Sequence, residues 1–154
     1  MSRAFVKELA ESTVLPDRPL SQHPNLVTEE GLRALDAEVA RWRAAYAAAQ
    51  LTDDEDHEDL SKAGRELRYW TARRHSAQLV DRHPDDAAAR FGSTVTMLRE
   101  DGRRLSFRIV GEDEADPAAG AISHVSPLAR AILGKAVGEV VQVAGHEIEI
   151  EALG

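Results

Sequence analysis

The stretch TEEGLRALDAEVARWRAAYAAAQ, residues 28–50, decides the first half of the fold. It opens on Thr28, a good N-cap residue, and the acids Glu29 and Glu30 suit the positive end of a helix dipole. Apolar side chains then recur at alternating intervals of three and four residues, at Leu32, Leu35, Val39, Trp42, Tyr46 and Ala49. This spacing predicts a helix with one apolar seam, of the kind that two helices use to pack along their length.

A second segment, from Leu60 to Val80, repeats the pattern. Its apolar positions are Leu60, Ala63, Leu67, Trp70 and Ala77, and Arg74 interrupts the seam. Only the short acidic stretch LTDDEDHED, residues 51–59, separates the two segments. We therefore predict an antiparallel helical hairpin, a coiled coil with arms of about 22 residues, or roughly 33 Å, and with Trp42 and Trp70 in its core.

The residues before the hairpin form a proline-rich stretch. Pro16, Pro19 and Pro24 break both helix and strand, so we expect an extended leader over residues 1–27. Whether this leader folds onto the hairpin stays open at this point. The predicted hairpin covers 28–81, and a linker over 82–90 connects it to a C-terminal domain, 91–154.

From Phe91 onward the apolar period changes to two, which is typical of strands. Residues 93–100 and 103–110 form a predicted β-hairpin around Asp101-Gly102. A short strand, 121–125, precedes a short helix, 126–134, that has Ser126 as its cap and Pro127 at its first position.

Two more strands, 137–144 and 146–153, close the chain around a turn at Gly145-His146. In the last strand Ile148, Ile150 and Ala152 are expected to face one side and the intervening glutamates the solvent. The predicted fold class is α+β: a helical hairpin followed by about five short, mostly antiparallel strands with one short helix.

Composition excludes several function classes. The 154 residues carry a formal net charge of −8 and include no cysteine, which argues against broad phosphate-backbone binding and excludes thiolate metal sites and cysteine nucleophiles. The six histidines are dispersed, and no glycine-rich phosphate loop is present. No apolar run is long enough to span a membrane. We expect a cytoplasmic protein, most simply a monomer, that is not a self-contained enzyme.

The seven positions 53–59 hold six carboxylates and His57. Carboxylate oxygens are ligands that Mg²⁺ prefers, and this ion keeps several waters, so the tip can share an ion supplied by another molecule. A solvated acidic loop explains the same residues. The second arm is basic, through Lys62, Arg65, Arg68, Arg73, Arg74 and Arg82, which allows either electrostatic steering or ordinary helix solvation.

Several phrases resemble the Gre family of bacterial transcript-cleavage factors, GreA and GreB. These are FGSTV (91–95), RIVGEDEAD (108–116) and SPLARAILG (126–134), together with the opening MSRAFVKE and the helix entry VTEEGLRAL (27–35). The resemblance implies an FKBP-like C-terminal domain behind a coiled-coil hairpin. It also implies docking at the rim of the RNA polymerase secondary channel, with the coiled coil inserted toward the active site.

Carried over residue by residue, the polymerase-binding surface falls on Ser123, Ser126, Pro127 and Ala129. In the family, a tip pair spaced Asp-x-x-Glu, within a motif like GDxxENAEY, helps the polymerase hold its second Mg²⁺. Here the nearest string is EDLSKAGREL, 58–67, in which Lys62 stands where the second carboxylate is expected.

Other tip carboxylates can supply the acid-x-x-acid spacing. Asp53 and Asp56, or Asp56 and Asp59, are therefore the predicted tip residues, acting in trans with the polymerase. The expected metal is an Mg²⁺ shared at Asp53 and Asp56, and no tightly bound cofactor is expected.

The leading hypothesis is a Gre-type elongation factor that binds RNA polymerase and modulates elongation or backtracked-transcript cleavage, meeting nascent RNA and DNA only indirectly. The arms are shorter than those of typical family members by about two turns each, or roughly 11 Å. The alternative is thus a non-cleaving regulator that occupies the channel and competes with cleavage factors. Prolyl isomerase activity is discounted, because a fold alone does not confer function.

Overall fold

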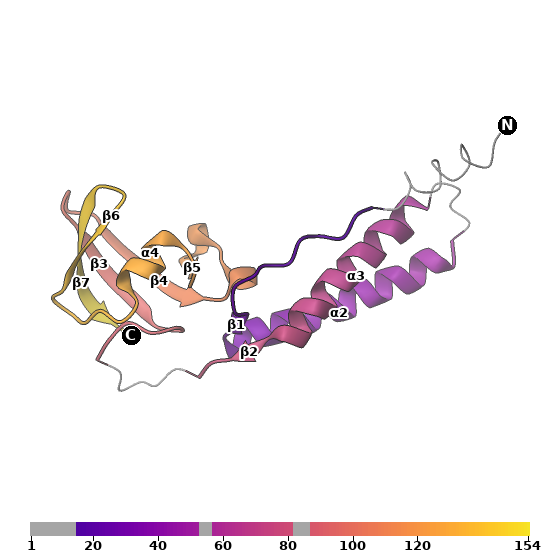
Figure 1. Ribbon diagram of the computed structural model, residues 1–154, viewed down its shortest axis with the longest axis horizontal. Coiled ribbons are helices and arrows are strands. Elements are labelled where there is room, and N and C mark those ends of the chain that lie inside the picture. The colour runs from indigo at the N-terminus through magenta and orange to yellow at the C-terminus, as the bar shows by residue number, and fades with distance from the viewer. Residues whose placement is uncertain (1–14, 53–56, 82–86) are drawn as a thin grey trace. The chain divides into compact units, whose positions relative to one another are not determined.

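The computed structural model describes residues 15–52, 57–81 and 87–154. It is α+β, as predicted: two long helices precede a five-stranded sheet with one short helix (Figure 1). The chain divides into two compact units, one with residues 1–22 and 33–76 and the other with 23–32 and 77–154. These units do not coincide with the sequence-based boundaries, because the first turn of the first long helix groups with the C-terminal residues. In the part of the chain that the structure describes, no helix could span a membrane.

The two long helices are α2, Glu29–Gln50, and α3, Glu58–Ser76. Within unit 1 they run antiparallel. Tyr46 in the second half of α2 lies against Gly64 near the start of α3, where a Cβ would be 3.4 Å from the ring. Asp36 near the start of α2 pairs with Arg74 near the end of α3 at 2.6 Å. The predicted antiparallel hairpin is therefore confirmed.

The apolar core of the hairpin is small. Leu35 and Ala63 are its buried hydrophobic side chains among the described residues. Trp42 and Trp70, expected in the core, are only half-buried, and their indole N–H groups donate to Glu38 and Glu66. Two helices bury only the single seam between them, so each bulky indole lies at the edge of this seam. There its N–H reaches a hydrogen-bond partner.

The second helix ends at Ser76, earlier than the predicted Val80. Residues 78 and 79 instead form β2 (Gln78–Leu79), which pairs in parallel with β1 (Leu26–Val27) in unit 2. The N–H of Gln78 donates to the carbonyl of Asn25 at 2.8 Å, and Val80 donates to Val27 at 3.0 Å. This pairing satisfies the backbone that would otherwise continue the helix. The end of the leader is thus a strand.

The sheet of unit 2 has the order β5-β4-β3-β7-β6. Its strands are β3 (Thr94–Arg99), β4 (Arg104–Val110), β5 (Ala121–Ser123), β6 (Val140–Val143) and β7 (His146–Leu153). Neighbours are antiparallel except β4 and β5, which are parallel. The short helix α4 (Pro127–Ile132) contributes to the core, whose largest fully buried side chains are Val95, Met97, Ile109, Ile132 and Ile150. The expected five strands and one short helix are confirmed.

Two details of the last strands differ from the prediction. The turn between β6 and β7 lies at Ala144-Gly145, both with positive φ, one residue earlier than expected. The register of β3 against β7 shifts, so that Thr96 opposes Ala152 while Met97 opposes Ile150. This bulge leaves Ala152 exposed and turns Leu153 toward the core instead.

The acidic loop after β4 is ordered into two short 3₁₀ helices, η1 (Glu112–Glu114) and η2 (Pro117–Ala119). Gly120 ends the second of them with φ +84°, a conformation that glycine adopts without strain. The N–H of Asp116 bonds to the carbonyl of Ala121 at 2.9 Å, which joins the end of the loop to the start of β5. The loop is therefore held at both ends of η2.

Candidate functional site

The predicted tip carboxylates Asp53 and Asp56 lie outside the described residues, between the end of α2 and the start of α3. Asp59 is described, and it is exposed on the first turn of α3. It lines a groove of about 360 Å³ together with Thr52 and Lys62. Among the described residues, no three His, Cys, Asp or Glu side chains could hold a metal ion together. A metal role for the tip stays a prediction.

The predicted docking residues surround the junction between β5 and α4. The Ser123 hydroxyl accepts a hydrogen bond from the N–H of Val125 at 3.2 Å. Ser126 is the N-cap of α4, with an extended backbone, and its hydroxyl accepts from the N–H of Ala129 at 3.2 Å. Pro127 occupies the first helical position, where its missing N–H costs nothing, and it is exposed. The two serines thus fix the backbone that presents Pro127 to solvent.

Ala129 does not share that surface. Its side chain is 0% exposed and belongs to the hydrophobic core of unit 2. A partner cannot touch a side chain in this position, so the prediction that Ala129 belongs to the docking surface needs correction. Its backbone N–H donates to the hydroxyl of the N-cap residue Ser126, which is a positioning role.

His124 lies behind the same junction, and nothing in the sequence distinguishes it from the other dispersed histidines. It is buried, its ring and that of Phe91 pack edge to face at 5.5 Å between centroids, and its backbone N–H donates to the carbonyl of Val110 at 2.9 Å. These contacts attach the start of the turn to the core. The only sequence signal was its place between β5 and Ser126.

A helix cap in unit 2, formed by Thr28 and Glu114, was also not predicted from the sequence. Thr28 caps α2 by accepting from the N–H of Gly31 at 3.0 Å, and Glu114 of η1 contacts the same cap. The Glu114 carboxylate accepts from the Thr28 N–H at 3.2 Å, from the Thr28 hydroxyl, and from the Gly111 N–H at 3.2 Å. In a capping box, a Glu three residues after the cap accepts the N-cap N–H. Here that position is Gly31, and Glu114 supplies the carboxylate.

Both glycines of this arrangement are required by space. A Cβ at Gly31 would overlap the Glu114 carboxyl group, and one at Gly111 would overlap the carbonyl oxygen of Leu26. The helix entry VTEEGL and the loop VGEDE therefore fit each other within unit 2. The sequence signal for this contact is Gly31, which stands three residues after Thr28, where a capping box has a Glu or Gln.

An ion pair adds to this contact. Glu30, in the first turn of α2, lies 3.3 Å from Arg108 of β4. A hydrogen bond from its own backbone N–H, together with the Arg108 charge, holds the pKa of Glu30 below its usual value.

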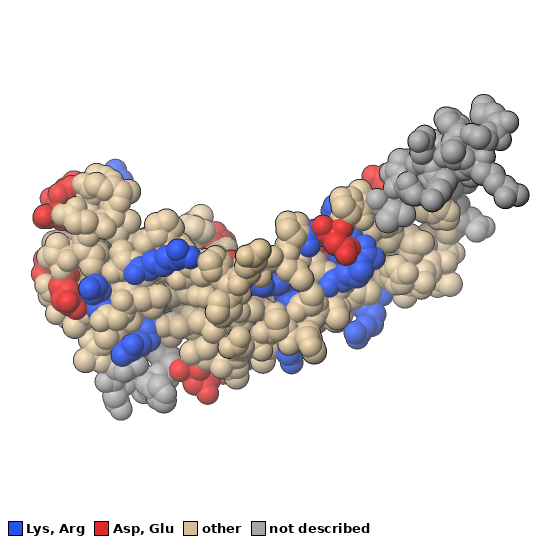
Figure 2. All heavy atoms as spheres, viewed as in Figure 1, with Lys and Arg blue, Asp and Glu red and all other residues tan. Residues whose placement is uncertain are grey.

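The predicted basic arm is largely paired in the described structure. Arg74 pairs with Asp36, Arg68 pairs with Asp17 at 2.6 Å, and Arg73 is buried. Figure 2 shows acidic and basic side chains side by side on the surface. Arg82 lies outside the described residues. Most of the basic side chains of the second arm therefore pair with acids or are buried.

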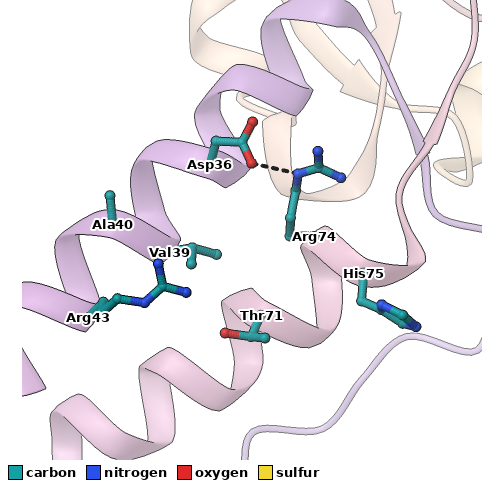
Figure 3. Close-up of a pocket in the computed structure, with 7 residues that line it drawn as sticks. All are labelled: Asp36, Val39, Ala40, Arg43, Thr71, Arg74 and His75. Carbon is teal, nitrogen blue, oxygen red and sulfur yellow. Dashed lines mark hydrogen bonds and ion pairs between the residues drawn. The ribbon is translucent and has the colours of Figure 1, made fainter.

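A groove of about 520 Å³ lies between α2 and α3 within unit 1 (Figure 3). Arg74 reaches across it to Asp36, as the dashed line in the figure shows. The residues that line the groove are Asp36, Val39, Ala40, Arg43, Thr71, Arg74 and His75. One carboxylate faces cationic side chains here, so the groove has a mixed charge and favours no single class of ligand.

Comparison with known proteins places these features in context. A model of the C-terminal region of the transcription elongation factors GreA/GreB matches residues 84–152. The transcription elongation factor GreB of Pasteurella multocida is 35% identical over 136 residues, which cover 77% of this chain and 86% of that protein. GreA of Legionella pneumophila is 34% identical over 155 aligned residues, covering 87% and 96%.

Solved structures are also similar. The GreA factor homolog 1 (Gfh1) of Thermus thermophilus has a TM-score of 0.41 and 23% identity, with 86% of this chain and 99% of that chain covered. A GreA/GreB factor from Nitrosomonas europaea has a TM-score of 0.41 and 17% identity, with 84% and 98% covered.

Proposed function

Because the chain belongs to the GreA/GreB family of transcription elongation factors, we propose that it binds RNA polymerase at the secondary channel and modulates elongation. In this proposal the β domain docks at the channel rim. The acidic hairpin tip acts inside the channel, on elongation or on the cleavage of backtracked RNA.

The observation that carries the docking proposal is the junction between β5 and α4. Ser123 and Ser126 fix its backbone through hydrogen bonds, and Pro127 is exposed at the start of α4. A rigid turn with an exposed apolar residue loses little conformational entropy on binding. Ala129 contributes through its backbone N–H and its place in the core.

Binding of purified RNA polymerase to the immobilised protein tests this proposal. Pro127→Asp places a charge on the exposed face, and we expect it to weaken retention at least about tenfold, the loss typical of a central interface residue. Pro117→Asp is the matched control, because Pro117 is also exposed and also begins a short helix, η2. Equal retention of both variants would refute docking through this junction.

The proposed role of the tip is to assist the polymerase rather than to catalyse alone. Two-metal cleavage needs a second Mg²⁺ about 3.5–4 Å from the first, and carboxylates at Asp53, Asp56 and Asp59 are the candidates to help hold it. The polymerase supplies the first ion and the substrate. The protein therefore needs no tightly bound cofactor of its own.

A second candidate function is a non-cleaving regulator that competes with cleavage factors for the channel. Lys62 is exposed beside Asp59 in the tip groove, and a cation there opposes metal binding. The alignment to the Legionella GreA has 155 positions but includes only 87% of the 154 residues of this chain. The other aligned positions are therefore residues of that relative that have no counterpart in this chain. A shortened hairpin is consistent with that difference.

A stalled, backtracked elongation complex separates the two functions. Shortened RNA that disappears with Asp53→Asn plus Asp56→Asn, at unchanged polymerase retention, supports cleavage stimulation. Glu58→Gln, an exposed acid of the first turn of α3, is the control for loss of charge alone. Unshortened RNA, together with slower cleavage by an added GreA, supports the competitor.

The proposed partner is bacterial RNA polymerase, met in the cytoplasm by a monomer. Contact with nascent RNA and DNA would arise only inside the elongation complex. The net charge of −8 fits this indirect mode, because it provides no general attraction to a phosphate backbone.

A further inference from the structure

The proline-rich segment 15–22 lies along α3 within unit 1 (Figure 1). At its start, the Leu15 N–H donates to the hydroxyl of Ser61 at 2.9 Å. Further along, Asp17 pairs with Arg68 at 2.6 Å, with both side chains more than half exposed. Later residues of the segment thus meet later residues of the helix, so the segment runs parallel to α3.

The central contact of the segment is Arg18. Its guanidinium pairs with Glu66 at 2.7 Å, and it lies 3.7 Å from the centroid of the Tyr69 ring and 5.6 Å from that of Trp70. The Trp70 indole N–H donates to the same Glu66 oxygen at 3.2 Å. The Glu66 side chain is only 12% exposed and that of Arg18 37%. One partly exposed cation therefore contacts both a largely buried acid and an aromatic pair.

The sequence of this segment is that of a proline-rich recognition motif, and its described contacts are made by Arg18, Asp17 and the backbone of Leu15. Pro16-Asp17-Arg18-Pro19 is a P-x-x-P sequence with an arginine inside it. Such segments are extended before binding, because proline fixes φ, and they dock on aromatic surfaces at low entropic cost. Tyr69 and Trp70, packed edge to face at 4.9 Å, provide the aromatic surface. Glu66 provides the charge that selects arginine.

The other arm of the hairpin shows what is particular to this site. On α2 the Trp42 indole N–H donates to Glu38 at 3.1 Å, the same spacing of four residues. There the cation over the indole is Arg41 of the same helix, at 4.9 Å. A Glu–Trp pair therefore does not require an arginine from elsewhere in the chain. Only the α3 pair takes one among the described contacts.

We propose that the face of α3 formed by Glu66, Tyr69 and Trp70 is a recognition site for extended P-x-x-P segments that carry an arginine. Residues 15–22 are its built-in ligand. A peptide of the same sequence competes with this segment for the site. Because a tethered ligand has an effective concentration in the millimolar range, the free peptide binds well only when the built-in arginine is removed.

A labelled peptide with the sequence of residues 15–22, LPDRPLSQ, tests the proposal against full-length protein. We expect the peptide to bind the Arg18→Ala protein at least about tenfold more tightly than the wild-type protein, which its own segment occupies. A peptide carrying the same Arg18→Ala change should bind neither protein. Binding should shift the Trp70 indole N–H resonance and leave the Trp42 indole as an internal control.

Failure to bind the Arg18→Ala protein at peptide concentrations up to about 10 mM, above the effective concentration of the tether, would overturn the proposal. Equal binding of the two peptides would do the same. Arg18→Lys is a second acceptor protein that keeps the charge but loses the planar stacking group, and it should bind the peptide with intermediate affinity. An unchanged Trp42 indole resonance shows that each variant remains folded. None of these outcomes depends on polymerase binding.

Discussion

Glu114 completes the N-terminal cap of α2 across 86 residues of sequence. Its carboxylate accepts from the N–H and the hydroxyl of Thr28 and from the N–H of Gly111, and so satisfies backbone donors at the start of α2 and of η1. Gly31 leaves the space in which this carboxylate lies. A local cap has thus become a tertiary contact within unit 2.

The first prediction concerns Gly31→Ala. On helix propensity alone, alanine should stabilise α2 by about 1 kcal/mol. The structure predicts the opposite sign, because a Cβ displaces the Glu114 carboxylate and breaks its bonds to Thr28. We expect a loss of about 1–2 kcal/mol in the free energy of unfolding, measured by urea denaturation.

A double-mutant cycle provides the control for that prediction. With Glu114→Ala in place, the obstruction is gone, and Gly31→Ala should then be neutral or stabilising. Glu149→Ala, an exposed acid on β7, should change stability by less than about 0.5 kcal/mol. A stabilising Gly31→Ala in the otherwise unchanged protein would contradict the described cap.

A second prediction at the residue scale concerns how Glu30 contributes to stability at low pH. Because the pKa of Glu30 is lowered in the folded state, its contribution to stability is present above the unfolded pKa and is lost as the pH falls through the folded one. Arg108→Ala removes the positive charge beside Glu30 and should therefore raise the pKa of this carboxyl group. NMR titration of the Glu30 carboxyl carbon measures that pKa. A pKa that does not move would show that the Arg108 pair has no electrostatic effect.

At the scale of elements, the two units differ in how much apolar surface they bury. The hairpin has Leu35 and Ala63 as its buried hydrophobic side chains, whereas β3, β4, β7 and α4 share a continuous core. Helices of this length draw most of their stability from packing. The hairpin is therefore the less stable element, and the segment 15–22 compensates by adding contacts along α3.

Amide hydrogen exchange checks this difference. We expect amides in the middle of α2 and α3 to exchange at least about tenfold faster than those of β3 and β7, because local opening of the hairpin costs less free energy than opening the sheet. The Arg18→Ala variant should accelerate exchange in α3 and leave β7 unchanged. Equal protection of both units would contradict the view of a thin hairpin core.

Much of this element-level structure was predictable from local patterns. The seam spacing gave both helices, and the period of two with Asp101-Gly102 gave the sheet, since each signal lies within a few consecutive residues. The end of α3 was misplaced because its cause, β1, lies some fifty residues earlier. The partners of Glu114 and Arg18, and the burial of Ala129, depend likewise on distant contacts that no local pattern encodes.

At the scale of the whole molecule, the charge is unevenly distributed along the sequence. Six carboxylates occupy positions 53–59, while several arginines of the second arm are paired with acids. The negative excess therefore falls on the connection between the helices. That is where the proposed function requires it, since a metal-bearing active site attracts carboxylates and a basic stem would bind nucleic acid indiscriminately.

The absence of cysteine makes a direct measurement of the central claim straightforward. Leu51, 88% exposed and one residue beyond α2, is replaced by cysteine and coupled to an iron chelate that generates hydroxyl radicals. Ser106→Cys, on an exposed position of β4, is the control. In a stalled elongation complex, we predict radical cuts near the RNA 3′ end from position 51 and none from position 106. An absence of cuts from position 51, with the protein still bound to polymerase, would contradict entry of the tip into the secondary channel.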